Sequence, residues 1–329
     1  MTQPTQKPSE APNPYASPLD LRHMLDQDAP ELTHVLPGLL AGTVGALVAP
    51  GGTGKTMFLL QTACAVATGR PLCDGLFDDV PPDCAMSPEP QRVVLVVAEE
   101  PPDVMWHRLR TARDALLGTR YPLLDRPALE DLLVQNLHVH ALLGRPGATL
   151  INGDRDRTRA LAQLTVSCKG ASLVMLDPLR QFHQLDENDS AAMSAVIQGL
   201  QSLAATTGAS VILAHHTNRA STNLGLGNTA GAARGSTALT DGVRWQLNLS
   251  PPAGDFARDN GIALGDQGQF LRVDFAKVNY LPPLAPRVLK RGAGGVLTLY
   301  RPDVSDATQA PRAPKRLATR AAPRARRPA

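Results

Sequence analysis

The octapeptide APGGTGKT, residues 49–56, constrains the fold of this chain more than any other segment. It follows the apolar run GTVGALVAP (42–50) and leads into KTMFLLQTACAVATG (55–69), so it joins an expected strand to an expected helix. Glycines at such a junction let backbone N–H groups converge on an anion, and the helix N-terminus adds its partial positive charge. This arrangement predicts a phosphate-binding loop.

The loop predicts a bound nucleotide, ATP, together with Mg²⁺. We expect the nucleotide to contact eight consecutive residues: Pro50, Gly51, Gly52, Thr53, Gly54, Lys55, Thr56 and Met57. Lys55 would reach the outer phosphates as a point charge, and the Thr56 hydroxyl would bind Mg²⁺. The strict pattern begins with glycine where this chain has Ala49, a mild departure because this residue precedes the tight turn. A fortuitous glycine-rich turn is the alternative interpretation.

Apolar runs and helical patterns alternate along most of the chain. Strands are expected at 42–50, 91–100, 137–143, 171–177 and 209–216, and helices at 55–69, 101–117, 155–168 and 190–208. This order predicts an α/β fold with a mostly parallel sheet flanked by helices. Further strands at 241–250, 269–280, 285–291 and 294–302 are expected to form a C-terminal antiparallel extension of the sheet.

Two of these strands end in acidic residues. Asp177 closes the run LVMLD, where its carboxylate would hold the Mg²⁺ shell by way of water. Glu99 lies at the end of VVLVVAEE and could accept the proton of a water that attacks the terminal phosphate. Glu100, one residue on, is expected to point elsewhere. The alternative is that both glutamates only begin the following helix.

Two adjacent histidines, His215 and His216, close the strand SVILAHH. Neighbouring strand residues point to opposite faces, so the pair is poorly placed to hold one metal ion. The strand is expected beside the one that ends at Asp177, which would bring its end close to the terminal phosphate. One histidine would then sense that phosphate and couple it to the long segment 217–236. One packed and one solvated histidine is the alternative.

Several arginines are candidates for contacts with nucleic acid or with a neighbouring subunit. Arg219 and Arg234 of the 217–236 segment, and Arg180 of PLRQFHQLDENDS, are expected to contact a phosphodiester backbone; His183 shares the latter segment. Arg244 is expected to reach the nucleotide of a neighbouring copy, with Lys277 as a second candidate. Both could instead be surface cations. Arg108 and Arg110 are weaker candidates for positioning roles.

Charge and composition divide the chain into three parts. Residues 1–18 are rich in Pro, Gln and Ser and are expected to form a disordered arm, and residues 19–302 the folded domain. The tail 303–329 is expected to be disordered; seven of the 33 Lys and Arg residues, and no acidic residue, lie in 307–329. It would touch nucleic acid or only aid solubility. No signal peptide and no apolar stretch of roughly 20 residues is present, so we expect a cytoplasmic protein without membrane contact.

Jointly, these motifs resemble the plasmid RepA-type hexameric replicative helicases. The segments LPGLLAGTVGALVAPGGTGKT, VAEEPPDVMWHRL, LVMLDPLRQFH, VILAHHTN, ARGS, VRWQ and AKVNY occur in the family's order and context, between about Leu36 and Tyr300. The resemblance implies a RecA-like P-loop ATPase fold. It also implies a ring of six copies that hydrolyses ATP, moves along single-stranded DNA and unwinds a forked duplex, with a plasmid initiator or primase as possible partners.

The resemblance also implies roles for individual residues. Lys55 and Thr56 would bind phosphates and Mg²⁺, Glu99 would activate water, and Asp177 would serve the metal. His216 or His215 looks like the sensor of the terminal phosphate, and Arg244 like the residue that reaches a neighbour's nucleotide. A RecA-like recombination or repair ATPase, a DNA-binding regulator that does not unwind and, last, a small-molecule kinase are the alternatives.

Overall fold

The computed structural model describes residue 13 and residues 15–119, 124–217 and 237–302. The chain divides into two units, Met1–Thr33 and His34–Ala329. In the first unit, helix α1 (Leu21–Asp26) begins after Asp20, whose side chain accepts a hydrogen bond from the His23 N–H group. The expected arm over 1–18 lies mostly outside the described residues, as does the tail from residue 303 onwards, so the expected domain boundaries stay predictions.

The second unit is built on a sheet of nine described strands, in the order β11-β10-β9-β8-β3-β7-β6-β4-β5. These strands are β3 (Val44–Ala49), β4 (Val93–Val97), β5 (Leu137–Ala141), β6 (Leu173–Asp177), β7 (Ser210–His216), β8 (Trp245–Ser250), β9 (Phe270–Val278), β10 (Arg287–Arg291) and β11 (Leu297–Leu299). The strands from β8 to β5 pair in parallel, whereas β9, β10 and β11 continue the sheet antiparallel. Strands β1 (His34–Leu36) and β2 (Leu39–Leu40) pair separately. The predicted fold class is confirmed.

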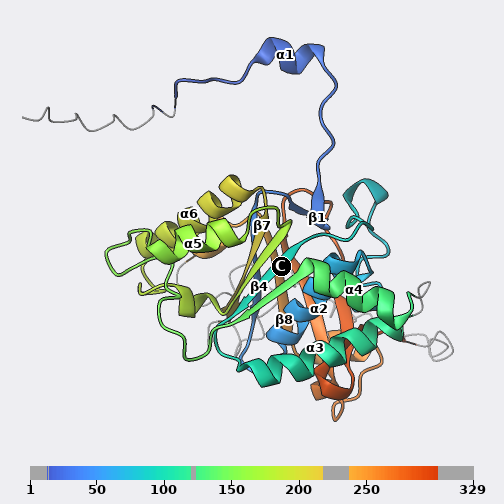
Figure 1. Cartoon of the computed structure of the whole chain (residues 1–329). Coiled ribbons are helices and arrows are strands. Elements are labelled where there is room, and N and C mark those ends of the chain that lie inside the picture. Colours follow the sequence, from blue (N-terminus) through green and yellow to red (C-terminus); the bar gives the residue numbers. More distant parts are fainter. Residues whose placement is uncertain (1–12, 14, 120–123, 218–236, 303–329) are drawn as a thin grey trace, which may run out of the picture. The chain divides into compact units, whose positions relative to one another are not determined.

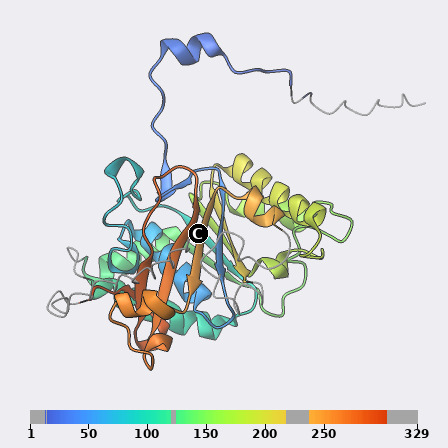
Figure 2. The same cartoon turned by 180° about the vertical axis from the view of Figure 1, so that it is seen from behind.

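Helices cover both faces of this sheet, as Figure 1 shows. They are α2 (Lys55–Thr68), α3 (Pro102–Leu117), α4 (Arg126–Asn136), α5 (Arg159–Ser167), α6 (Ser190–Thr207), α8 (Ala238–Gly242) and α9 (Gly254–Asp259). Side chains of α2, α3 and α4 pack on one face, and those of α5, α6 and α8 on the other. Figure 2 gives the view from behind, with the C-terminal strands in front of α2. Among the described helices, none combines the length and the apolar character that a membrane span requires.

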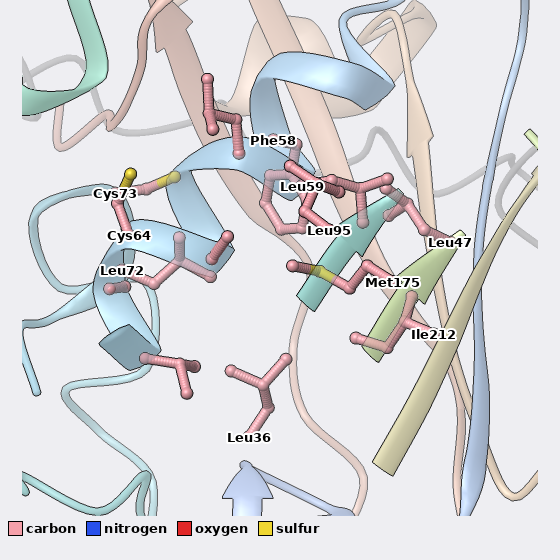
Figure 3. Packing of buried hydrophobic residues seen from close by; sticks show 14 of the residues in the cluster. Leu36, Leu47, Phe58, Leu59, Cys64, Leu72, Cys73, Leu95, Met175 and Ile212 are labelled. Atoms are coloured by element: carbon pink, nitrogen blue, oxygen red, sulfur yellow. The ribbon is translucent and has the colours of Figure 1, made fainter. Parts of the chain in front are cut away.

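Residues along a central strand alternate between the two layers. Leu47 of β3 packs in the cluster that contains α2, whereas Ala46 and Val48 pack in the cluster that contains α6. Figure 3 shows the first cluster, where Phe58 and Leu59 of α2 lie among residues of several strands. A strand buried on both faces needs apolar side chains at every position, which is why the sequence shows continuous apolar runs here.

Three features differ from the sequence-based expectations. The strand expected over 241–250 begins only at Trp245, because α8 occupies the preceding residues. This strand, β8, pairs in parallel with β3 and antiparallel only with β9, so the antiparallel extension starts one strand later than expected. Helices α4 and α9 were not expected; few of their residues are buried, so their apolar pattern is weak.

Candidate functional site

The carboxyl ends of β3, β7, β6 and β4 meet at one edge of the sheet because these strands are parallel neighbours. Ala49 at the end of β3 is in register with His216, and Val97 at the end of β4 is in register with Asp177. Ligands of open α/β sheets bind at this edge. Here it carries an open hollow of about 790 Å³, whose lining includes Lys55, Thr56 and Asp177.

The loop between β3 and α2 has the backbone shape that its glycines allow. Gly52 and Gly54 take positive φ angles of 70° and 101°, which residues with a side chain rarely adopt. Helix α2 then begins at Lys55, so its first N–H groups are directed toward the hollow end of the loop. All eight residues from Pro50 to Met57 therefore lie where the sequence expected a phosphate-binding loop.

Lys55 is buried at the base of the loop, with 7 % of its surface exposed. Its Nζ atom lies 3.2 Å from the carbonyl oxygens of Ala49 and Pro50, and 3.2 Å from Nδ1 of His216. Burial lowers the pKa of Lys55, and the nearby carboxylates of Asp177 and Glu99 oppose this shift. The ammonium group is thus held by backbone carbonyls and one imidazole, where an anion in the hollow could replace them.

Thr56 and Asp177 come together from α2 and β6. The Thr56 hydroxyl donates a hydrogen bond to Oδ2 of Asp177 over 2.6 Å. Burial raises the pKa of Asp177, while the Thr56 hydrogen bond and the Lys55 charge act in the opposite direction. Mg²⁺ prefers a few oxygen ligands from the protein together with phosphate oxygens and water. This pair of oxygen donors beside the phosphate-binding loop fits that ion.

The two glutamates that follow β4 have different partners. Oε1 of Glu99 accepts a hydrogen bond from Nε2 of Gln181 over 3.1 Å, and Oε1 of Glu100 pairs with Nη2 of Arg108 over 2.7 Å. Both line the hollow, contrary to the expectation that Glu100 points elsewhere. The reason is that β4 ends at Val97, so strand alternation no longer applies to these two residues.

His215 and His216 lie on different sides of β7, as strand geometry predicts. His216 lines the hollow and contacts Lys55, and its pKa is lowered by burial and by the Lys55 charge. His215 is only 2 % exposed and lies near His183, whose pKa is lowered to about 4 mainly by burial. Of the two, His216 is therefore the one placed to meet a ligand in the hollow.

The expected DNA-contacting arginines are only partly described. Arg180 is exposed and donates from Nη1 to the Leu185 carbonyl over 2.9 Å, which closes its own loop after β6. His183 of the same loop is buried and accepts a hydrogen bond from the Leu185 N–H group. Arg219 and Arg234 lie outside the described residues.

Arg244 and Lys277 lie at the opposite edge of the sheet from Lys55. The Arg244 N–H group donates to the Val44 carbonyl at the beginning of β3. Nζ of Lys277 donates to the Thr240 carbonyl over 2.8 Å, and its pKa is lowered by burial and by the charge of Arg244. The length of β3, roughly 16 Å, separates this edge from the loop of the same chain.

Of the two arginines of α3, only Arg108 reaches the hollow. Arg108 lines it through the ion pair with Glu100, whereas Arg110 is exposed and is not part of its lining.

The sequence analysis missed the contribution of the hairpin formed by β10 and β11. Arg291, Gly294 and Gly295 line the hollow, and Nη2 of Arg291 donates to the Thr53 carbonyl of the loop. No local signal marks these residues, because only the order of the strands brings them to the loop. The 3₁₀ turn Ala293–Gly295 connects the two strands.

Comparisons with known proteins agree with this geometry. Residues 7–222 match the AAA domain family AAA_25. One solved structure of an isolated ATPase domain superimposes with a TM-score of 0.53 at 15 % identity, over 85 % of this chain and 96 % of that one. A DnaB-like replicative helicase, solved in a study of its interactions with primase, gives 0.53 at 16 % identity, over 84 % of this chain and 66 % of that one. At such identities, the likeness concerns the fold. The chain belongs to the AAA domain family and has the RecA-like P-loop ATPase fold.

Proposed function

We propose that this protein is an ATP-dependent replicative DNA helicase of the plasmid RepA type. ATP hydrolysis would drive a ring of six copies along single-stranded DNA and separate a forked duplex. The observation that carries the proposal is the convergence of Lys55, Thr56, Asp177, Glu99 and His216 on one hollow at the carboxyl edge of the sheet. These are the residue types that nucleotide hydrolysis requires, each from a different structural element or turn.

Lys55 and the loop backbone would bind the phosphates of ATP. The ammonium group would exchange the carbonyls of Ala49 and Pro50 for phosphate oxygens without moving far. Thr56 and Asp177 would hold Mg²⁺, which when bound neutralises charge that develops on the phosphate oxygens. Removal of that ion is therefore expected to stop turnover.

Glu99 would orient the attacking water and accept its proton. This carboxylate is exposed and next to the hollow, so it can face a water molecule opposite the bound phosphates. Its hydrogen bond to Gln181 also connects it to the loop that carries Arg180. That connection supports a link between DNA contact and hydrolysis.

DNA contact and subunit assembly complete the proposal. Arg180, Arg219 and Arg234 would contact the single strand in the central channel, and Arg244 would reach the nucleotide of the next copy. The position of Arg244 at the far edge of the sheet supports a contact between subunits, because it excludes one within the chain. A primase or a plasmid initiator is the proposed loading partner.

The test is ATP hydrolysis with and without single-stranded DNA, together with displacement of a labelled strand from a forked duplex. Stimulated hydrolysis and strand release are expected for the wild-type chain. Lys55→Ala should abolish both, and Lys169→Ala, which removes an exposed lysine far from the hollow, should retain both. Glu99→Gln should still bind ATP but hydrolyse it at least about a hundredfold more slowly.

Other outcomes favour the alternative functions. Stimulated hydrolysis without strand release by the purified chain would point to a recombination or repair ATPase. ATP binding with negligible response to DNA would point to a regulator that changes shape without unwinding. Unwinding by the Lys55→Ala protein would contradict the assignment of the site.

A further inference from the structure

The hairpin of β10 and β11 is fixed to the helix that follows the phosphate-binding loop. Gln61 of α2 donates from Nε2 to the Leu297 carbonyl over 2.9 Å, and its Oε1 accepts from the Leu297 N–H group over 2.8 Å. Gln61 is buried, so these two hydrogen bonds are shielded from water. The hairpin is therefore held against α2 at a defined height, with its turn beside the loop.

Arg291, the last residue of β10, extends from this hairpin over the phosphate-binding loop. It donates to the Thr53 carbonyl, and a Cβ atom added to Gly54 would lie 2.9 Å from its Nη1 atom. The guanidinium is half-buried and lines the same hollow as Lys55. A guanidinium has five N–H donors, so the bond to Thr53 leaves others for an anion in the hollow.

Arg291 approaches the loop from the opposite flank to the residues around the terminal phosphate. Glu99, Asp177 and His216 follow or end β4, β6 and β7, which lie on one side of β3 in the sheet. Arg291 ends β10, which lies on the other side, beyond β8 and β9. A phosphate chain in the loop would therefore have its terminal group near His216 and an inner phosphate near Arg291.

We propose that Arg291 is a phosphate-binding residue of this site, which contacts the inner phosphates of a nucleotide bound by the same chain. The proposal rests on the proposed nucleotide-binding function. Burial lowers the pKa of Arg291, so its charge is partly desolvated and an anionic partner would compensate for this. Since the inner phosphates are common to ADP and ATP, loss of Arg291 should weaken the binding of both.

The experiment is titration of the full-length chain with fluorescent N-methylanthraniloyl analogues of ADP and ATP. Arg291→Gln is expected to weaken both by at least about tenfold, as for loss of a hydrogen bond to a charged group. Arg291→Lys, which keeps the charge, should recover part of the affinity. Arg287→Gln is the matched control: Arg287 begins the same strand, pairs with Asp79, and should leave both affinities unchanged.

The outcomes separate this inference from the proposed function. If Lys55→Ala weakens both nucleotides but Arg291→Gln weakens neither, the role of Arg291 is wrong and the site stands. If Arg291→Gln weakens ATP only, the contact with the inner phosphates is wrong. If Lys55→Ala itself leaves both affinities unchanged, the proposed nucleotide site fails.

A second measurement needs no variant, in case Arg291→Gln does not fold. The wild-type chain is treated with phenylglyoxal, which modifies arginine, with and without MgADP, and adducts are located by mass spectrometry. Modification of Arg291 should slow by at least about fivefold with MgADP, as a guanidinium bonded to phosphate is shielded, while Arg287 should react equally in both samples. Equal modification of Arg291 in the two samples would overturn the proposal.

Discussion

The Nζ atom of Lys55 lies 3.2 Å from Nδ1 of His216. An ammonium group only donates hydrogen bonds, so Nδ1 is the acceptor and the ring proton is on Nε2. The lowered pKa of His216, caused by burial and then by the Lys55 charge, keeps the ring neutral. Nε2 is then a donor that can bind a phosphate oxygen, while Nδ1 holds Lys55 in place.

We therefore predict that His216→Ala separates hydrolysis from DNA. ATP should still bind to the loop with an affinity within about threefold of the wild type, because the loop backbone and Lys55 remain. Stimulation of hydrolysis by single-stranded DNA should fall by at least about tenfold, since a hydrogen bond to a charged group is lost. His216→Asn keeps an acceptor for Lys55 but lacks Nε2 and should behave like His216→Ala. Unchanged stimulation in both variants would show that His216 senses nothing.

Gln181 gives a second prediction about coupling. Its hydrogen bond holds Glu99 in the absence of ligand, and it lies next to Arg180 in the loop after β6. Gln181→Ala should free the carboxylate, so hydrolysis without DNA should rise about two- to fivefold, as for loss of one weak exposed hydrogen bond. Gln184→Ala, a change at another exposed glutamine of the same loop, is the control. Lower hydrolysis in Gln181→Ala, with and without DNA, would instead mean that Gln181 holds Glu99 in its active orientation.

The central strands and the loop could be predicted because each is encoded locally. Val93–Val97 and Leu173–Asp177 are buried on both faces, so their apolar runs leave little ambiguity. The glycines around Lys55 and the helix after them also form one short segment. Parallel pairing then brings Asp177 and His216 to the same edge, which is why most of the candidate site could be inferred before the fold was known.

The contribution of Arg291 could not be predicted in this way. Its contact with Thr53 joins residues 238 positions apart, and it depends on the order of β8, β9 and β10 in the sheet. Hydrophobic periodicity reports which face of a strand is buried but not which strands are neighbours. The direction of Glu100 was missed for a related reason, because the pattern does not show that β4 ends at Val97.

His183 gives a prediction about stability and pH. Burial first, then Arg180 and His215, lower its pKa from 6.5 to about 4, and Glu187 opposes them. Among the described residues its Nε2 atom has no hydrogen-bond partner. Below pH 6.5 the unfolded chain therefore binds a proton that the folded chain does not, so stability falls as pH falls toward 4. At pH 4.5 this group costs about 2 to 3 kcal/mol relative to pH 7.

The measurement is the free energy of unfolding in urea at pH 7 and pH 4.5. His183→Asn keeps an acceptor for the Leu185 N–H group but has no ionisable ring. Its loss of stability between the two pH values should be smaller than that of the wild type by about 2 to 3 kcal/mol. Equal losses in the two proteins would show that His183 is not a buried neutral imidazole.

Arg244 leads to the prediction that depends most on assembly. The length of β3 separates it from Lys55 of its own chain, which an arginine side chain cannot span, so any contact with nucleotide needs a second copy. Arg244→Ala should therefore hydrolyse ATP at least about a hundredfold more slowly than the wild type while its own loop still binds nucleotide. Arg258→Ala, which removes an exposed arginine of α9, should be as active as the wild type.

Mixing two inactive variants tests this arrangement directly. Lys55→Ala subunits supply an intact Arg244, and Arg244→Ala subunits supply an intact Lys55, so mixed rings contain some complete sites. In a random one-to-one mixture, about a quarter of the interfaces are complete, and hydrolysis should return to a comparable fraction of the wild-type rate. Co-elution of the two differently tagged chains shows that mixed rings have formed. Mixed rings without recovered hydrolysis, or full activity of Arg244→Ala alone, would contradict a role for Arg244 at the neighbour's nucleotide.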